Sequence, residues 1–436
     1  MKMKKRFLSF LLCVCMILAC APANADAGGD APDFASSVTL DMNSETAKIE
    51  VTVKTFVDGD TTHFHVSESV MPSGVLKARY LAINTPESTG KIEEWGKAAA
   101  AFTREKLSGA TSIIIESDTS GWDLDSTGDR HLVWVWYKTD DMTEYRNLNI
   151  EILQNGYAIP NSAANNRYGS VCMEAIAYAR ENKLRVHSGK QDPDFYYGDA
   201  VELTIKELRC NIDSYSGIKV AFNGVVTIND NNSVYVEAFD PETGLYFGIP
   251  VYYGFGLSGK GLSILDVGHE VRIVGTVQYY EAGGTWQVSG LSYSMMRPKD
   301  PGNIQLISEG HEAAWAVTSP AAFLHDTVTI LNEEEPITLS YGEAIMGSTV
   351  QMHDLEVVYV YTTDNEDSSS NGAMTLTCKH GDDTICVRTT VLRDKDGKLI
   401  TQDAYYGKTI DVKGVVDFYE GKYQIKVFSP DHITVR

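Results

Sequence analysis

Two short stretches decide the fold: "FVDGDTTHF" at residues 56–64 and "ARYLAINTPE" at residues 78–87. Each has the residue pattern of a β-strand and runs into a polar turn. The first turn carries Asp60, the second strand carries Arg79, and its turn ends at Glu87. Charged side chains at the ends of two neighbouring strands predict a polar site on the rim of a small sheet.

The surrounding sequence predicts a mainly β domain with a few helices. Strand patterns cover residues 49–66, with a break at "DGDT", and the stretches "VLKARYLAI", "TSIIIES" and "RHLVWVWYK". Helix patterns cover "EEWGKAAAAFTREKLSG", which Gly109 ends, "RNLNIEILQNG", which Gly156 ends, and "VCMEAIAYARENK". This order of elements is typical of a small barrel with helices packed on it, and we assign it to residues 47–190.

The rest of the chain contains an internal repeat. "VGHEVRIVGTVQYYEAGGTWQVSGLSY" (267–293) is echoed by "YGKTIDVKGVVDFYEGKYQIKVFSPDHI" (406–433). Two copies of this length indicate two similar β-barrel modules rather than a solenoid. We assign them to residues 200–298 and 315–436, which gives the three domains that 436 residues lead one to expect.

The N-terminus reads as a secretion signal. Basic residues precede an apolar run in residues 1–25, and the run is too short to span a membrane. Two endings fit equally: a lipoprotein box with a lipidated Cys20, or cleavage after "ANA" at residues 23–25. A small, polar linker at 26–46 follows. We therefore expect a secreted or extracytoplasmic protein, either free or lipid-anchored at the cell envelope.

Charge is distributed unevenly along the chain. The net charge is −22, and residues 191–436 hold 17 Lys and Arg against 35 Asp and Glu. Such a charge repels polyanions, so we expect the aromatic stretches here, such as "VQYY" and "DFYEGKYQI", to form hairpin pairs and core rather than base-stacking platforms. Cys378 and Cys386 fit a hairpin disulfide and two buried thiols equally well.

Oxygen ligands gather at the two polar turns. Asp60 offers a carboxylate and Asn84 an amide oxygen, and Pro86 forces Thr85 into an extended or turn conformation that frees its main-chain carbonyl. These are the hard ligands that Ca²⁺ prefers. A turn residue without a ligand would also explain Asp60 taken alone, because "DGD" is common turn chemistry.

The remaining polar residues suit phosphodiester chemistry. Glu87 lies where it could act on a water beside the metal, and Arg79 and Arg130 could fork onto phosphate oxygens. The alternative is an inactive set of ion pairs. In it, Arg79 binds Asp60 or Glu87, and Arg130 binds Asp125 or Asp129. Because all the groups occur in register, metal-assisted hydrolysis is the favoured interpretation.

At this point the chain resembles the staphylococcal nuclease (thermonuclease) family over residues 49–189. Five motifs carry the resemblance in order: "VDGDT", "RYLAINTPE", "GKAAAAFTREKL", "DRHLVWVW" and "LNIEILQNGYA". The resemblance implies an OB-type five-stranded barrel with three helices. It also implies calcium-dependent cleavage of DNA and RNA to products that end in a 3′-phosphate.

The resemblance also implies the role of each residue. Asp60 would be a calcium ligand and Thr85 would give its carbonyl. Arg79 and Arg130 would bind the phosphate and its transition state, and Glu87 would be the general base. The expected partner is nucleic acid, with single-stranded DNA or RNA favoured. We expect no organic cofactor and a monomeric chain.

Three features depart from the family. Asn84 stands where the second calcium carboxylate is usually an aspartate, and the segment before Arg130 lacks the usual aromatic residue. The nucleotide-stacking tyrosines have no clear match, although Tyr168 is a weak candidate. The rival interpretation is therefore a non-catalytic, envelope-associated binding protein with a degenerate nuclease barrel, whose C-terminal part binds a surface glycan or a protein.

Overall fold

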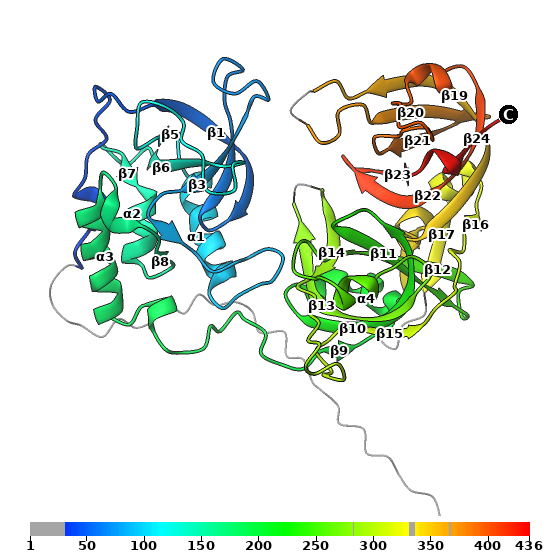
Figure 1. Cartoon of the computed structure of the whole chain (residues 1–436), viewed down its shortest axis with the longest axis horizontal. Helices are drawn as coiled ribbons and strands as arrows, with labels where there is room; N and C mark the ends of the chain where they lie inside the picture. The colour runs from blue at the N-terminus through cyan, green and yellow to red at the C-terminus, as the bar shows by residue number, and fades with distance from the viewer. Residues whose placement is uncertain (1–30, 282, 331–335, 366–367) are drawn as a thin grey trace, which may run out of the picture. The chain divides into compact units, whose positions relative to one another are not determined.

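The structure is a computed structural model, and it describes residues 31–281, 283–330, 336–365 and 368–436 (Figure 1). Residues Phe34–Arg436 form one compact unit, to which every element described below belongs. The predicted signal segment with Cys20 lies outside the described residues. Within the described ranges, no helix combines the length and the apolar character that a membrane crossing requires.

The first domain is a closed barrel of five strands. These are β1 (Lys48–Asp58), β2 (Thr61–His65), β3 (Val75–Tyr80), β5 (Ser112–Glu116) and β6 (His131–Lys138). The order around the barrel is β1-β2-β3-β6-β5, where β3 and β6 are parallel and β5 pairs antiparallel with β1. This closed, five-stranded arrangement is OB-like and confirms the predicted fold class.

Three helices pack on this barrel, as predicted. They are α1 (Gly96–Ser108), α2 (Leu148–Gln154) and α3 (Gly169–Glu181). Helix α1 ends at Gly109 as expected, and its alanines and long side chains favour helix. It begins three residues later than the sequence pattern, because Trp95 has a left-handed φ of 66°.

A buried carboxylate, that of Glu116, forms a hydrogen-bond network inside the first barrel. Glu116 accepts hydrogen bonds from Trp136 Nε1 at 3.0 Å, Thr46 Oγ1 at 2.7 Å and the Tyr168 hydroxyl at 3.1 Å. Lys48 Nζ lies 3.6 Å from Glu116 Oε1. Tyr168, the residue before α3, is half-buried, and its ring packs edge-on against Trp134 and Trp136, which argues against a role in nucleotide stacking.

Part of the segment predicted as a linker is packed on the first barrel. Residues Phe34–Ser36 form the short helix η1, and Ala35 is completely buried in the core of this domain. The Ala35 N–H donates a hydrogen bond to Gln154 Oε1 at 3.0 Å. Small residues here therefore serve close packing as well as chain flexibility.

The repeat corresponds to two further barrels with the same strand order. The second contains β10 (Lys219–Asn229), β11 (Ser233–Asp240), β12 (Leu245–Tyr252), β13 (Glu270–Tyr280) and β14 (Thr285–Ser289). The third contains β19 (Thr349–Thr362), β20 (Met374–His380), β21 (Asp383–Thr389), β22 (Thr409–Tyr419) and β23 (Lys422–Val427). The fourth and fifth strands of each barrel, β13–β14 and β22–β23, are the repeated hairpins.

The second sheet extends beyond its predicted end at residue 298. Strand β15 (Gln305–Ser308) pairs antiparallel with β13, in addition to the pairing of β13 with β10 that closes the barrel. Residues 295–303, "MMRPKDPGN", form turns that lead into this extra strand.

The two hairpin cysteines are free thiols on opposite faces of β20–β21. Cys378 pairs with Ile385 and Cys386 with Thr377, a one-residue offset that directs the two side chains to different sides of the sheet. Cys378 lies in the barrel core, where burial raises the pKa of its thiol to about 12. The structure therefore decides for two thiols and against the disulfide.

Candidate active site

The first polar turn joins β1 to β2 and is packed tightly against α1. Gly59 leaves no room for a side chain, because a Cβ there would lie 2.9 Å from Ala99 Cβ and 2.9 Å from Thr85 Cγ2. The neighbouring Asp58 and Asp60 are both buried. Glycine is needed at this position so that the two aspartates can be drawn in against the second turn.

The second polar turn follows β3 and is held by the first. Ala82 has a left-handed φ of 71°, which turns the chain into the short strand β4 (Ile83–Asn84). The Thr85 N–H then donates to Asp60 Oδ2 at 2.7 Å. This hydrogen bond between turns 25 residues apart explains why the predicted ligands meet.

Arg79 connects the predicted metal ligands. Its Nη1 forms an ion pair with Asp60 Oδ1, and its Nη2 donates to Asn84 Oδ1 at 2.6 Å. Burial, followed by the nearby charge of Arg130, lowers the pKa of Arg79. The ion pair with Asp60 that we considered as an alternative is thus present. Arg79 is also close enough to Arg130 for the charge of Arg130 to affect its pKa.

Arg130 approaches from the loop before β6. Its Nη2 lies 2.6 Å from Asp125 Oδ2, and its Nε donates to the same oxygen at 2.8 Å. Burial opposes ionisation of Asp125, but hydrogen bonds from Thr127 and Arg130 prevail and lower the pKa of Asp125. About a third of the Arg130 side chain is exposed, so the guanidinium remains accessible to a ligand.

Glu87 shares a hydrogen bond with Asp58, a residue that our sequence analysis did not select. Partial burial, this hydrogen bond and the charge of Asp58 together raise the pKa of Glu87 to about 7, although Arg79 lowers it. Asp58 Oδ1 also accepts hydrogen bonds from Gly59 N at 2.8 Å and Ser88 Oγ at 3.0 Å. The signal was available in "DGD", where both aspartates flank the glycine.

The two turns carry the types of oxygen that a hard cation prefers. Asp58, Asp60 and Asn84 bring two carboxylates and an amide to one place, and the Thr85 hydroxyl is buried beside them without a hydrogen-bond partner. Over the described ranges, no group of three His, Cys, Asp or Glu has the arrangement of a metal site. A calcium ion here would need amide and carbonyl oxygens besides the carboxylates.

Comparison with known proteins agrees with this geometry. Residues 77–187 match the family model described as "Staphylococcal nuclease homologue". A comparison with curated proteins found no match. The matched segment holds Arg79, Asn84, Thr85, Glu87 and Arg130, whereas the turn with Asp58 and Asp60 precedes it and the two C-terminal barrels follow it. The N-terminal barrel is therefore similar to staphylococcal nuclease domains over residues 77–187.

Proposed function

We propose that this protein is a secreted, calcium-dependent nuclease that hydrolyses phosphodiester bonds of DNA, RNA or both to 3′-phosphate products. The observation that carries the proposal is the convergence of Arg79, Arg130 and Glu87 on one rim of the barrel. Arg79 is close enough to both Arg130 and Glu87 for their charges to affect its pKa, and ionisable groups with perturbed pKa values gather at functional sites.

Glu87 is the general base in this proposal. A pKa near 7 gives its carboxylate enough basicity to take a proton from a water, while a large fraction remains ionised at neutral pH. Asp58 positions Glu87 through their shared hydrogen bond and tunes its basicity.

The two arginines stabilise the phosphate. Arg79 and Arg130 bind its non-bridging oxygens as the water, which loses its proton to Glu87, attacks the phosphorus in line, and their charge offsets the negative charge that develops. The bond from phosphorus to the 5′-oxygen breaks, and this oxygen leaves as a hydroxyl after it takes up a proton from solvent. Arg79 is held by Asp60 and Asn84, and Arg130 is held by Asp125, so both guanidinium groups are oriented before the substrate arrives.

Asp60, Asn84 and the main-chain carbonyl of Thr85 would hold calcium, with Asp58 as a second carboxylate beside them. When bound, the ion supplies positive charge that polarises the phosphate and the water next to it. Secretion suits a site with a neutral ligand, because extracellular calcium reaches millimolar concentrations. Attachment to the cell envelope, through a lipid at Cys20 or through the C-terminal barrels, belongs to the same proposal.

The rival function is a non-catalytic binding protein, and one observation favours it. The oxygens of Asp60 and Asn84 are engaged by Arg79, so a cation must compete with a guanidinium for them.

A single experiment separates the two functions. Purified protein is incubated with denatured DNA in calcium and in excess chelator, beside Glu87→Gln, and the product ends are analysed. Calcium-dependent cleavage to 3′-phosphate ends, lost in the variant, supports the nuclease. Cleavage that persists in chelator contradicts the proposed calcium dependence, and no cleavage under either condition favours the rival.

A further inference from the structure

The loop after Glu87 is held by the second barrel. Gln278 Oε1 accepts from Gly90 N at 3.1 Å, and Gln278 Nε2 donates to Gly90 O at 2.8 Å. Ser289 Oγ donates to the same carbonyl at 2.9 Å. Gln278 and Ser289 are both buried, so these bonds satisfy polar groups that would be costly to leave unpaired.

The same face of the β13–β14 hairpin continues beyond this contact. Val277 and Val288 point into the barrel core, so by strand alternation Gln278, Tyr280 and Gln287 point outward. The Tyr280 side chain is 49% exposed. Gln278, whose amide binds the loop after Glu87, is therefore followed on the same face of the strand by the exposed ring of Tyr280.

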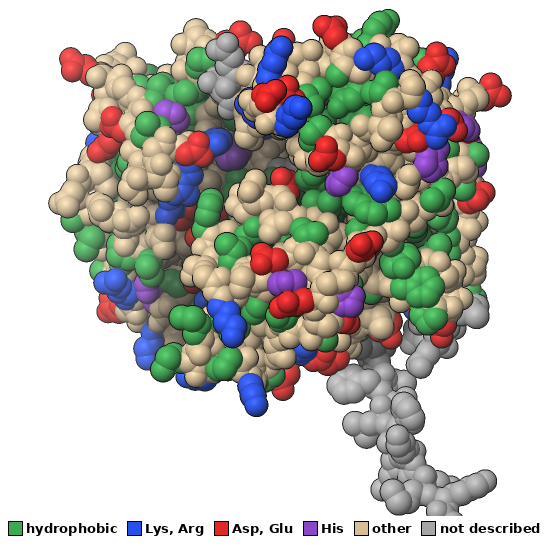
Figure 2. Space-filling view, turned by 45° about the vertical axis from the view of Figure 1, so that its right-hand side comes forward, with side chains coloured by type: hydrophobic (Ala, Val, Ile, Leu, Met, Phe, Trp, Pro, Cys, Tyr) green, Lys and Arg blue, Asp and Glu red, His purple; other side chains and the backbone are tan. Residues whose placement is uncertain are grey.

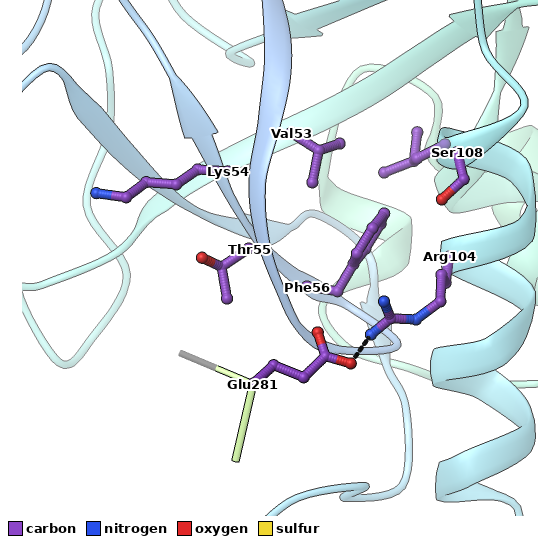
Figure 3. A pocket seen from close by; sticks show the side chains of 8 residues that line it. Val53, Lys54, Thr55, Phe56, Arg104, Ser108 and Glu281 are labelled. Atoms are coloured by element: carbon purple, nitrogen blue, oxygen red, sulfur yellow. Dashed lines mark hydrogen bonds and ion pairs between the residues drawn. The ribbon is translucent and has the colours of Figure 1, made fainter. Parts of the chain in front are cut away.

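A groove of about 1110 Å³ joins this face to the candidate active site. Asp58, Glu87 and Arg104 line it on the nuclease side, and Tyr252, Tyr280 and Gln287 line it on the hairpin side. A smaller adjoining pocket shares Arg104, whose guanidinium carbon lies 4.6 Å from the centre of the Phe56 ring (Figure 3). The groove is thus bordered by aromatic rings and guanidinium as well as by the general base.

We propose that this groove binds the nucleotides of a single-stranded substrate next to the bond that is cut, with Tyr280 and Tyr252 as stacking surfaces for the bases. The inference rests on the proposed nuclease function and adds a subsite from outside the nuclease-like domain. Exposed tyrosine rings suit single strands, because unpaired bases present a free face and every base has one. The subsite supplies the stacking that Tyr168 cannot provide.

The acidic charge of residues 191–436 led us to expect no grip on nucleic acid, and the groove lining is acidic too, with the carboxylates of Asp58, Glu87, Glu105 and Glu281 against Lys97 and Arg104. The proposed subsite therefore depends on stacking rather than on charge attraction. Its nuclease wall carries Lys97 and Arg104, and Arg104 forms an ion pair with Glu281, the acidic residue at the hairpin tip (Figure 3). Figure 2 shows acidic and basic side chains interspersed over the face in view rather than gathered in one acidic patch. Stacking is also less sensitive to net charge than phosphate contacts are.

The test uses the full chain and Tyr280→Ala. Kinetics are measured in calcium with an eight-nucleotide single strand and with a dinucleotide, and binding of the labelled eight-mer is measured in chelator. Loss of a stacked base should raise KM for the eight-mer, and its Kd, roughly 5-fold or more, with little change in kcat. The dinucleotide, which is too short to reach the hairpin and the cut site together, should be affected much less.

Matched variants identify the cause. Tyr280→Phe keeps the ring and should behave like the parent, and Tyr359→Ala removes an equally exposed strand tyrosine of the third barrel and should have no effect. If Tyr280→Ala binds and cuts the eight-mer like the parent, the subsite is refuted while the nuclease function stands. If the parent binds but does not cut, the nuclease function fails and the binding arm still tests the groove. If the parent neither binds nor cuts, both fail.

Discussion

Replacing Asp58 by asparagine tests the electrostatics of the candidate site most directly. Asp58 raises the pKa of Glu87 in two ways, through a shared hydrogen bond and through its negative charge. The substitution removes the charge, and the new amide N–H₂ donates to Glu87, which favours the ionised carboxylate instead of the protonated acid. We therefore expect the pKa of Glu87 to fall in Asp58→Asn.

The size of the change follows from the order of the causes. Partial burial of Glu87 is the largest cause of its raised pKa and persists in the variant, whereas the two contributions of Asp58 come next and are lost. A like charge or a hydrogen bond typically shifts a carboxyl pKa by roughly one to three units. The pKa should thus fall from about 7 by roughly one to two units.

The assay is a ¹³C NMR titration of side-chain carboxyl groups in chelator, with the Glu87 signal assigned by its loss in Glu87→Gln. Glu93→Gln is the matched control, because Glu93 contributes a weaker charge effect than Asp58 and should give a smaller fall. A Glu87 pKa that stays near 7 in Asp58→Asn would refute the pairing of these two carboxyls, and with it the role of Asp58.

Three further predictions concern the rest of the site. Removing either guanidinium, in Arg79→Ala or Arg130→Ala, should lower kcat roughly 10²-fold or more under saturating calcium, and a loss below 10-fold would exclude that arginine from the transition state. Asn84→Asp adds a carboxylate to the oxygen set and should lower the calcium concentration for half-maximal activity, which a calcium titration measures; an unchanged midpoint would mean that Asn84 is not a ligand. Gly96→Ala places a Cβ 2.1 Å from the Glu87 carbonyl oxygen and should destabilise the protein by about 1–3 kcal/mol in urea unfolding while it reduces activity; unchanged values for both would contradict this packing.

The sequence predicted the elements of the fold because their signals are local. Strand alternation, alanine-rich helix and helix-ending glycine each follow from a few neighbouring residues, and β1, β3 and the C-terminal end of α1 lie where these patterns placed them. The late start of α1 was missed because it depends on how Gly96 packs under the chain at Glu87, a contact between elements.

The candidate site was predictable in composition but not in connectivity. The residue types at the turns indicated calcium and phosphate chemistry, yet Asp58 was overlooked because it looks like an ordinary turn residue in "DGD". Its importance comes from the hydrogen bond with Glu87, which depends on how the two turns pack. Likewise, no local pattern links Gly90 to Gln278, which is 188 residues away.

Asn84 affects both how strongly Arg79 is held and how strongly calcium would bind. Asp60 and Arg79 neutralise each other, so a neutral residue at position 84 leaves the Arg79 Nη2 in a hydrogen bond without a second negative charge. An amide holds a guanidinium less strongly than a carboxylate does, so a substrate phosphate competes more easily for that donor. An aspartate at the same position would attract calcium but would also retain Arg79. We therefore expect Asn84→Asp to improve calcium affinity and lower kcat, and these opposite effects trace to one oxygen atom that serves both the metal site and the arginine.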